Sequence, residues 1–381
     1  MIDLKESRDK IDEIDGQIVR LFEERMKVAG DVAEYKLETK KPVLDREREL
    51  QKLAVLESMA HTDFNRDAIR ELYEQIMSMS RKYQYGLINT KYPERAFTNY
   101  RRCEDFGLDK AGSVCYFGVP GTYTQQAMFK IFGEDVTGHH ERTFHGVMKA
   151  VQDGRTEFGV LPIENSSTGG VSANYDSILE YDNAIVGQYV LPIRQCLIGL
   201  KGANISDIRT IYSHPQGLMQ CRHFLESDKD VQTIEYESTA AAAKKVADDG
   251  DISQAAIAGA QAASAYGLEV IAEDIQDIKD NSTRFIVIGP ENIYTGDSDK
   301  ISLCFELPHT SGSLYRILSH FLFNGLNLTL IESRPIPGRK WEYRFFVDVE
   351  GNLDSPAVKN ALRGIHEEAS FFRILGNYKA I

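Results

Sequence analysis

The middle of the chain carries five short polar segments whose side chains could share one binding site. Each contains hydroxyl, amide or glycine residues, and the segments are 118–124, 162–170, 213–220, 237–241 and 281–285. The first four follow a predicted strand, and the fifth leads directly into one. Any one of them is typical of a turn, because Asn, Ser, Thr and Gly are ordinary turn residues. Side chains at the carboxyl ends of sheet strands gather at one edge, so five such segments favour one site over five unrelated loops.

The apolar runs of this region predict the elements that would position these segments. They alternate with helical patterns and lie at 114–119, 158–163, 184–191, 210–212, 255–258 and 285–288. Such alternation predicts an α/β fold. The turn at 118–124 has neither the G-x-x-x-x-G-K-S/T nor the G-x-G-x-x-G pattern, which disfavours a nucleotide site.

A long helix is predicted at the amino end, from Leu4 to about residue 38. This stretch has no proline, and its apolar residues recur at helical spacing: Leu4, Ile11, Ile14, Ile18, Leu21, Val28 and Val32. A helix of roughly 35 residues is about 50 Å long, so it must pack against other helices of this chain or of another subunit. Pro42 ends it, Asp45 can cap a second helix, and a third is predicted at about 65–84.

Cations on the first helix could line a pocket. Arg25 and Lys36 are eleven residues apart, so they lie within about 20° of each other on one helical face. Arg8 lies about 100° from Arg25 and would point toward a neighbouring chain. Two interpretations remain open for this region. It is either a dimerising coiled coil with solvated charges or a bundle that contains a charged pocket.

The carboxyl-terminal region is predicted to have the order βαββαβ, which is typical of a ferredoxin-like α+β fold. Its elements are expected at 300–307, 313–324, 326–332, 342–349, 357–368 and 371–375. No catalytic group of residues is evident there, so a dimerisation sheet is one interpretation of this region.

Length and composition limit the class of protein. The 381 residues suggest three domains, at 1–90, 112–290 and 299–381, with a linker at 91–111. No apolar run approaches the roughly 18 residues that cross a bilayer, and the charged amino terminus lacks a secretory signal, so a cytoplasmic location is expected. A net charge of −13 argues against nucleic-acid binding. The five scattered cysteines form no C-x-x-C pair, and neither a metal nor a cofactor is expected.

Residues 1–90 resemble the helical chorismate mutase family in the order and spacing of polar residues. The matching positions are Arg8, Arg25, Lys36, Asp45, Arg48, Glu49, Ser80 and Gln84. The resemblance implies a pocket shared across an interlocked dimer, with Arg8 supplied by the partner chain. Conversion of chorismate to prephenate is a rearrangement that needs orientation and charge stabilisation but no nucleophile. Arginines would hold the carboxylates, while Lys36 and Gln84 would donate to the breaking ether as catalytic residues.

Residues 112–290 resemble prephenate dehydratase, through the five polar segments taken together. The resemblance implies two α/β lobes like those of a periplasmic binding protein, with prephenate between them. The expected substrate-binding residues are Thr122, Asn165, Ser166, Ser213, Gln220, Ser238, Thr239, Thr283 and Arg284. Thr283 would donate a hydrogen bond to the departing hydroxyl and Arg284 would anchor a carboxylate. A threonine hydroxyl stays protonated at neutral pH, so Glu164 is a second candidate for the proton source.

The carboxyl-terminal region resembles an ACT regulatory domain. Its two phenylalanine-binding segments would be Gly312, Ser313, Leu314, Tyr315 and Glu332, Ser333, Arg334, Pro335. Ser313 and Tyr315 stand where the commoner family pattern has alanine and valine. The family binds phenylalanine between paired domains, which implies a homodimer or higher homo-oligomer and feedback inhibition.

These resemblances predict a bifunctional enzyme of phenylalanine biosynthesis without a cofactor. The helical domain would make prephenate, the central domain would dehydrate and decarboxylate it to phenylpyruvate, and the last domain would sense the amino-acid product. Two alternatives remain open, an arogenate dehydratase activity in the central domain and a non-catalytic amino-acid sensor.

Overall fold

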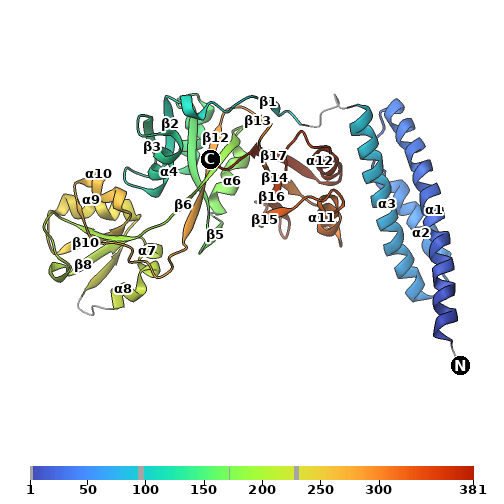
Figure 1. Ribbon diagram of the computed structural model, residues 1–381, viewed down its shortest axis with the longest axis horizontal. Coiled ribbons are helices and arrows are strands. Elements are labelled where there is room, and N and C mark those ends of the chain that lie inside the picture. Colours follow the sequence, from blue (N-terminus) through green and yellow to red (C-terminus); the bar gives the residue numbers. More distant parts are fainter. Residues whose placement is uncertain (1–2, 93–97, 171, 227–230) are drawn as a thin grey trace. The chain divides into compact units, whose positions relative to one another are not determined.

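The computed structural model describes residues 3–92, 98–170, 172–226 and 231–381, which form two compact units (Figure 1). One unit contains the chain up to Asn99 together with Leu303–Ile374, and the other contains Tyr100–Ser302 and Leu375–Ile381. Residues 93–97, part of the predicted linker at 91–111, lie outside the described residues. No helix of the described chain has the length and apolarity that a bilayer crossing requires.

Three helices open the first unit: α1 (Leu4–Thr39), α2 (Arg46–Ser58) and α3 (Asp63–Lys91). Their first turns are capped by Asp3, Asp45 and Thr62, whose side chains accept hydrogen bonds from backbone N–H groups. The three predicted helices are therefore present. The third continues seven residues past the predicted end at Gln84, because no proline lies between Gln84 and Pro93 and because Tyr85 and Ile88 are buried.

The apolar stripe on α1 is exposed in the single chain. Leu4, Ile11 and Leu21 are 62%, 55% and 65% exposed, and the residues that α1 buries are the small Ala29 and Ala33 together with Leu37. The stripe that predicted a packed helix thus has no cover within the described part of this chain. Packing against another subunit stays a prediction.

The rest of the first unit is a four-stranded sheet with two helices. Its elements are β14 (Lys300–Glu306), α11 (Ser313–Phe323), β15 (Leu328–Pro335), β16 (Tyr343–Glu350), α12 (Pro356–Glu368) and β17 (Phe371–Tyr378), with strand order β15-β16-β14-β17. Helices α11 and α12 both contact α3. Strand β15 runs three residues past its predicted end at Glu332 and finishes at Pro335, which an edge strand tolerates because proline's missing N–H would face solvent.

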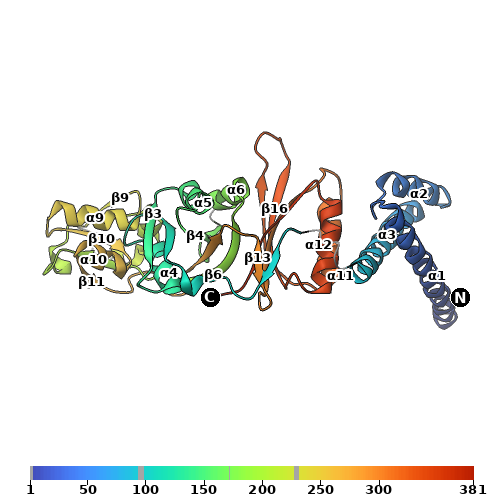
Figure 2. The ribbon, with the colours of Figure 1, turned by 90° about the horizontal axis from the view of Figure 1, so that it is seen from above.

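The first lobe of the second unit is a mixed sheet with helices on both faces. Its main strands are β2 (Ser113–Phe117), β3 (Thr137–Glu141), β4 (Phe158–Asn165), β6 (Ala184–Pro192) and β12 (Ser282–Gly289), in the order β6-β12-β4-β2-β3. Helices α5 (Phe144–Gln152) and α6 (Ser172–Glu180) cover one face and α4 (Tyr123–Phe132) the other (Figure 2). Smaller elements are β1 (Arg101–Cys103), η1 (Leu108–Lys110), β5 (Gly169–Gly170) and β13 (Ile293–Thr295).

The second lobe is a five-stranded sheet in the order β11-β7-β10-β8-β9. Its elements are β7 (Cys196–Gly199), η2 (Ile205–Asp207), β8 (Thr210–Ser213), α7 (Pro215–Gln220), α8 (Arg222–Glu226), β9 (Gln232–Glu235), α9 (Thr239–Asp249), β10 (Gln254–Ala258), α10 (Ala260–Tyr266) and β11 (Glu269–Ala272). The predicted two-lobed α/β arrangement is confirmed.

Two chain crossings at 193–195 and 273–281 join the lobes, and they bond to each other. The backbone N–H of Ile193 donates to the Asn281 carbonyl (2.9 Å), and that of Ile275 donates to the Gln195 carbonyl (3.0 Å). A two-stranded crossing of this kind links the lobes without a third connection among the described residues.

Candidate active sites

The beginning of β12 is the centre of the polar region in the second unit. The sequence predicts this strand from Phe285, but it begins at Ser282, because β4 and β6 pair with it from both sides there. Thr283 lies opposite Asn165 on β4, and Arg284 lies opposite Glu164. Successive side chains of a strand point to opposite faces, so these two pairs occupy opposite faces of the sheet. A register shift between Arg284 and Phe285 marks a β-bulge, a feature that re-aims side chains beside sites.

A buried amide network fixes Thr283. The Asn165 Nδ2 amide lies 2.9 Å from Asn281 Oδ1, 3.0 Å from Thr283 Oγ1 and 3.1 Å from the Ser282 carbonyl. Its Oδ1 accepts hydrogen bonds from the backbone N–H (3.0 Å) and the hydroxyl (2.6 Å) of Ser167. Because Thr283 Oγ1 accepts from Asn165, its own O–H is left to donate elsewhere. The network thus makes Thr283 an oriented hydrogen-bond donor.

Arg284 is paired on the opposite face. Its Nε donates to Glu164 Oε2 (3.1 Å) and its NH1 group to Gln188 Oε1 (3.3 Å), with 11% of the arginine side chain exposed. The two candidate proton sources, Thr283 and Glu164, are therefore on different faces of the sheet. The arrangement joins Glu164 to Arg284 and Thr283 to Asn165.

Other predicted substrate-binding residues have hydrogen bonds that serve the fold. Thr122 caps α4 and donates to the Val119 carbonyl, while Ser238 caps α9. Ser166 accepts from the Ser282 N–H, and Gln220 accepts from Gln195. Thr239 begins α9. Ser213 is fully buried and its hydroxyl donates to the Ile257 carbonyl (2.7 Å) on the neighbouring strand, so the hydroxyl faces into its own sheet.

The strand edges that carry these residues approach each other across the two lobes. Gln216 Nε2 lies 3.3 Å from Thr168 Oγ1, and the Tyr266 hydroxyl donates to the Pro120 carbonyl (2.7 Å). Gly121 has a φ of +84°, and a Cβ there would lie 3.0 Å from the Ala262 Cα. Only glycine fits both constraints. The segments after β4 and β8 therefore meet, and the segment after β2 contacts α10. A single site shared by all five segments stays a prediction.

Tyr123 lies in the predicted polar segment 118–124 but is not among the predicted substrate-binding residues. Its hydroxyl donates to the Arg194 carbonyl (2.6 Å) in the first lobe crossing, and Gln195 Oε1 lies 3.1 Å away. Burial raises the pKa of Tyr123 well above its ordinary value, so it stays a donor. The hydroxyl of its neighbour Thr122, at the start of a helix, suggests a binding residue from the sequence alone. An aromatic residue at the same place suggests only an ordinary core residue.

The first unit gathers most of the predicted mutase residues. Arg25 donates to the Ser80 hydroxyl, and Lys36 Nζ donates to the Val43 carbonyl (2.5 Å), just before Asp45. Burial lowers the pKa of Arg25, and it lowers that of Lys36 against the opposing charges of Asp45, Glu49 and Glu367. Desolvated cations attract a carboxylate more strongly than solvated ones do.

Three further mutase residues differ in environment. Gln84 is buried, and its Oε1 has no hydrogen-bond partner among the residues described. The side chains of Arg8 and Arg48 are exposed, and Arg8 lies in the amino-terminal half of α1, away from the Arg25–Ser80 contact. Supply of Arg8 by another chain stays a prediction.

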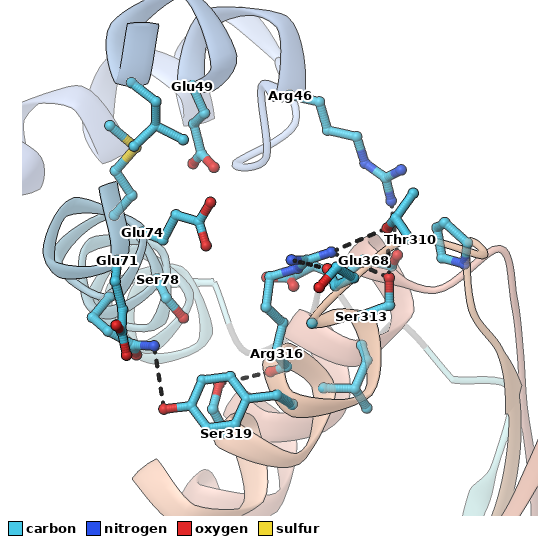
Figure 3. A pocket seen from close by; sticks show the side chains of 18 of the residues that line it. Arg46, Glu49, Glu71, Glu74, Ser78, Thr310, Ser313, Arg316, Ser319 and Glu368 are labelled. Carbon is cyan, nitrogen blue, oxygen red and sulfur yellow. Dashed lines mark hydrogen bonds between the residues drawn. The ribbon is translucent and has the colours of Figure 1, made fainter. Parts of the chain in front are cut away.

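A cavity of about 810 Å³ lies beside α2, α3 and the start of α11 (Figure 3). Gly312, Ser313 and Tyr315 of the first predicted effector segment line it, and Tyr315 accepts a hydrogen bond from Gln75 on α3 (3.2 Å). The second segment, Glu332 to Pro335, lies on edge strand β15 and is not part of the lining. This cavity therefore does not unite the two predicted effector segments.

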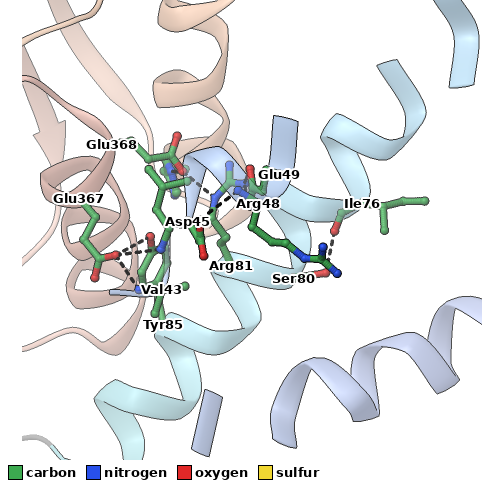
Figure 4. A network of polar contacts seen from close by, with 12 residues as sticks. Val43, Asp45, Arg48, Glu49, Ile76, Ser80, Arg81, Tyr85, Glu367 and Glu368 are labelled. Carbon is green, nitrogen blue, oxygen red and sulfur yellow. Dashed lines mark hydrogen bonds and ion pairs between the residues drawn. The ribbon is translucent and has the colours of Figure 1, made fainter. Parts of the chain in front are cut away.

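A buried ion-pair network joins α2, α3, α11 and α12 (Figure 4). Arg81 NH1 lies 2.6 and 2.7 Å from the two oxygens of Glu49, and its Nε lies 3.0 Å from Glu368 Oε1. The same Glu368 oxygen lies 3.1 Å from His320 Nε2. Burial alone would raise the pKa of Glu368, but the His320 hydrogen bond and the Arg81 charge outweigh it and lower that pKa to about 2. Sequence reasoning missed Arg81, because a charged residue at a helical surface position gives no sign of a partner far along the chain.

Family models match two parts of the chain. Residues 7–85 match the model described as chorismate mutase type II, and residues 114–293 match the model described as prephenate dehydratase. The bifunctional chorismate mutase/prephenate dehydratase of Aquifex aeolicus (strain VF5) is 35% identical over 382 residues, which cover 99% of this chain and 98% of that protein. The chain belongs to the bifunctional chorismate mutase/prephenate dehydratase family.

Two further similarities concern the part of this family member that follows the helices. A protein of Arabidopsis thaliana described as arogenate dehydratase/prephenate dehydratase 2, chloroplastic, is 38% identical over 276 residues, covering 70% of this chain and 72% of that protein. The crystal structure of a prephenate dehydratase from Arthrobacter aurescens in complex with L-Phe is 31% identical with a TM-score of 0.66. The matched region covers 70% of this chain and 90% of the Arthrobacter chain.

The lowered pKa of Glu368 predicts a specific loss of stability in acid. A carboxyl whose pKa is depressed in the folded state stabilises that state above its unfolded pKa, and the contribution is lost as the pH falls through the folded value. For Glu368 the window runs from about 4.5 down to about 2, and the contribution is of order 3 kcal/mol. In urea unfolding followed at several pH values, Glu368→Gln should flatten this acid slope, whereas Glu71→Gln, at an exposed glutamate, should not. An unchanged slope in Glu368→Gln would contradict the assignment.

Proposed function

We propose that this chain catalyses two successive reactions, chorismate to prephenate on the helices and prephenate to phenylpyruvate in the two-lobed unit. The observation that carries the proposal is that one chain matches both family models, chorismate mutase type II over residues 7–85 and prephenate dehydratase over residues 114–293. This places the protein in phenylalanine biosynthesis. A non-catalytic sensor would have no need for the desolvated Arg25 and Lys36 beside Ser80 and Asp45.

In the mutase reaction the residues act by orientation and charge. Arg25 and Arg48 would hold the two carboxylates of chorismate, with Ser80 aligning Arg25 and Asp45 ordering the start of α2. Lys36 and Gln84 would donate to the ether oxygen as the bond breaks and negative charge develops on it. The proposed site is completed by Arg8 of a second copy, which also agrees with the exposed apolar stripe of α1.

In the dehydratase reaction the substrate loses its ring hydroxyl and a carboxylate as carbon dioxide, and the ring becomes aromatic. The Thr283 O–H, oriented by Asn165, would donate to the departing hydroxyl and assist its loss. The Arg284 guanidinium already donates to Glu164 and Gln188. It would therefore hold a substrate carboxylate only through N–H groups that these two residues do not engage. Glu164 is bonded to Arg284 on the opposite face from Thr283, which favours Thr283 over Glu164 as the donor.

The carboxyl-terminal part of the chain is proposed to be an ACT regulatory domain that binds phenylalanine. The element order from β14 to β17, with strand order β15-β16-β14-β17, supports a ferredoxin-like fold. Strand β15, which carries Glu332 to Pro335, is an edge strand and can pair with a second copy. Pairing would bring the second effector segment of one copy near its neighbour, so the proposed assembly is a homodimer or a higher homo-oligomer.

An arogenate dehydratase activity is the second candidate for the two-lobed unit. The similarity to the Arabidopsis protein described as an arogenate dehydratase/prephenate dehydratase is the reason to test it. Purified enzyme supplied with chorismate should form prephenate and then phenylpyruvate, each followed separately. Supplied with arogenate, it should form phenylalanine at least about tenfold more slowly than it forms phenylpyruvate from prephenate. Faster turnover of arogenate would make it the preferred substrate, and the absence of both products from chorismate would support the sensor.

Phenylalanine is expected to inhibit the dehydratase reaction. An effector that binds one conformation of a paired domain more tightly shifts the population toward that conformation. Initial rates of phenylpyruvate formation should fall several-fold as phenylalanine is raised to millimolar concentrations, while alanine at the same concentrations should have no effect. Rates that stay constant across that range would contradict the proposed ACT function.

A further inference from the structure

We propose that Arg81 is a positioning residue for the mutase reaction, which holds Glu49 in place and is itself anchored by Glu368 of the carboxyl-terminal region. The inference rests on the proposed mutase function and on the resemblance to the chorismate mutase family, which implies that Glu49 lines the chorismate pocket. It adds a residue of the helical region and a residue far along the chain to the set on which this reaction depends.

The geometry of Arg81 fits a single orientation of Glu49. Arg81 follows Ser80 on α3, and its NH1 group meets both oxygens of the Glu49 carboxylate, at 2.6 and 2.7 Å. The Arg81 side chain is 5% exposed and that of Glu49 is 28% exposed. A guanidinium held from two sides fixes a carboxylate in direction as well as distance, which a flexible ammonium does not.

Glu368 provides the second side of this arrangement. Its Oε1 accepts from Arg81 Nε (3.0 Å) and lies 3.1 Å from His320 Nε2, and the Glu368 and His320 side chains are 7% and 0% exposed. A buried guanidinium with one carboxylate removed is strongly destabilised. The position of Arg81 therefore depends on both glutamates, one on α2 and the other at the end of α12.

The end of α12 also holds the turn that leads into α2. Glu367 Oε2 accepts hydrogen bonds from the backbone N–H groups of Val43 (3.2 Å) and Leu44 (3.4 Å) and from the Tyr85 hydroxyl (3.2 Å). Arg46 donates to the Glu368 carbonyl (2.8 Å). The Val43 carbonyl in turn accepts a hydrogen bond from Lys36 Nζ. Glu367 and Glu368 therefore hold in place the backbone segment to which this proposed pocket residue is bonded.

The mutase reaction is sensitive to such positioning, because it gains its rate from orientation and charge rather than from covalent chemistry. A displacement of about 1 Å in a site of this kind can cost roughly a hundredfold in rate. Loss of Arg81 should therefore reduce the mutase rate through Glu49, while the dehydratase reaction in the other unit keeps its rate.

The test compares Arg81→Lys, Arg81→Met, Glu49→Gln and the double variant Glu49→Gln/Arg81→Met in the full-length chain. Arg81→Met should lower mutase kcat/KM by about ten- to hundredfold, and Arg81→Lys, which keeps the charge, should recover only part of it. The double variant should be no worse than Glu49→Gln alone, because Arg81 acts through Glu49. Dehydratase rate and circular dichroism report whether each variant is folded.

Lys82→Met is the matched control. Lys82 is the next residue of α3, is 4% exposed and donates to Ser319 Oγ on α11 (2.9 Å), so its loss also disturbs the packing of α3 on α11. Its mutase rate should stay within about twofold of the unaltered enzyme. A loss in Lys82→Met equal to that in Arg81→Met, or additive losses in the double variant, would overturn the positioning role.

Glu49→Gln separates this inference from the proposed pocket. If Glu49→Gln retains full mutase activity, Glu49 is not part of the pocket, and the pocket assignment and the inference both fail. If Glu49→Gln is impaired while Arg81→Lys and Arg81→Met are fully active, the pocket assignment stands and the inference alone fails. Arg81→Lys keeps the test decisive should Arg81→Met not fold.

Discussion

The two-lobed unit depends on β12, a strand paired on both sides, whose polar first residues must satisfy their hydrogen bonds inside the sheet. β4 and β6 pair with β12 from Ser282 onward, and Phe285 and Val287 on it are buried in the core of the first lobe. A buried polar group without a partner costs about 1–3 kcal/mol, so the side-chain oxygens of Asn281 and Thr283 each require a local donor. The Asn165 amide supplies them, and the same bonds turn the Thr283 hydroxyl into a directed donor.

The first unit solves a related problem with charge. Arg81 has little exposed surface, and its guanidinium is stable there because carboxylates from α2 and α12 meet it. In both units the N–H groups of one side chain therefore link, by hydrogen bonds, segments that are distant in the sequence. Asn165 joins the end of β4 to the start of β12, and Arg81 joins the helices to the last helix of the chain.

Much of this architecture follows from local sequence patterns. The proline-free periodicity of α1, the cap at Asp45 and the alternation of apolar runs with helices each report on a few neighbouring residues, and each predicted the observed element. The boundaries were less predictable. Thr283 and Arg284 look like turn residues, but pairing from two sides makes them part of a strand. The four-residue strands β7, β9 and β11 are too short to give a clear period.

The candidate sites were predictable where the residue type itself suggests chemistry, as with Lys36, Asn165 and Thr283. They were not predictable where the decisive fact is a partner. Ser213 looks like Thr283 in the sequence, yet its hydroxyl is bonded within its own sheet. Arg81 and Glu368 are 287 residues apart, and no local pattern links them. Likewise the apolar stripe on α1 predicts burial but does not say which chain provides it.

Two separate groups of residues are thus proposed to catalyse successive reactions, and the oriented Thr283 hydroxyl is proposed to act in the second reaction alone. The most direct measurement supplies chorismate at neutral pH to Thr283→Val, which keeps the side-chain shape without the hydroxyl, and to Thr283→Ser, which keeps the hydroxyl. We expect Thr283→Val to accumulate prephenate at the unaltered rate while its phenylpyruvate formation falls by at least about a hundredfold, and we expect Thr283→Ser to retain much of its phenylpyruvate formation. If folded Thr283→Val formed phenylpyruvate at the unaltered rate, or lost prephenate formation as well, Thr283 would not be a donor that acts in the second reaction alone.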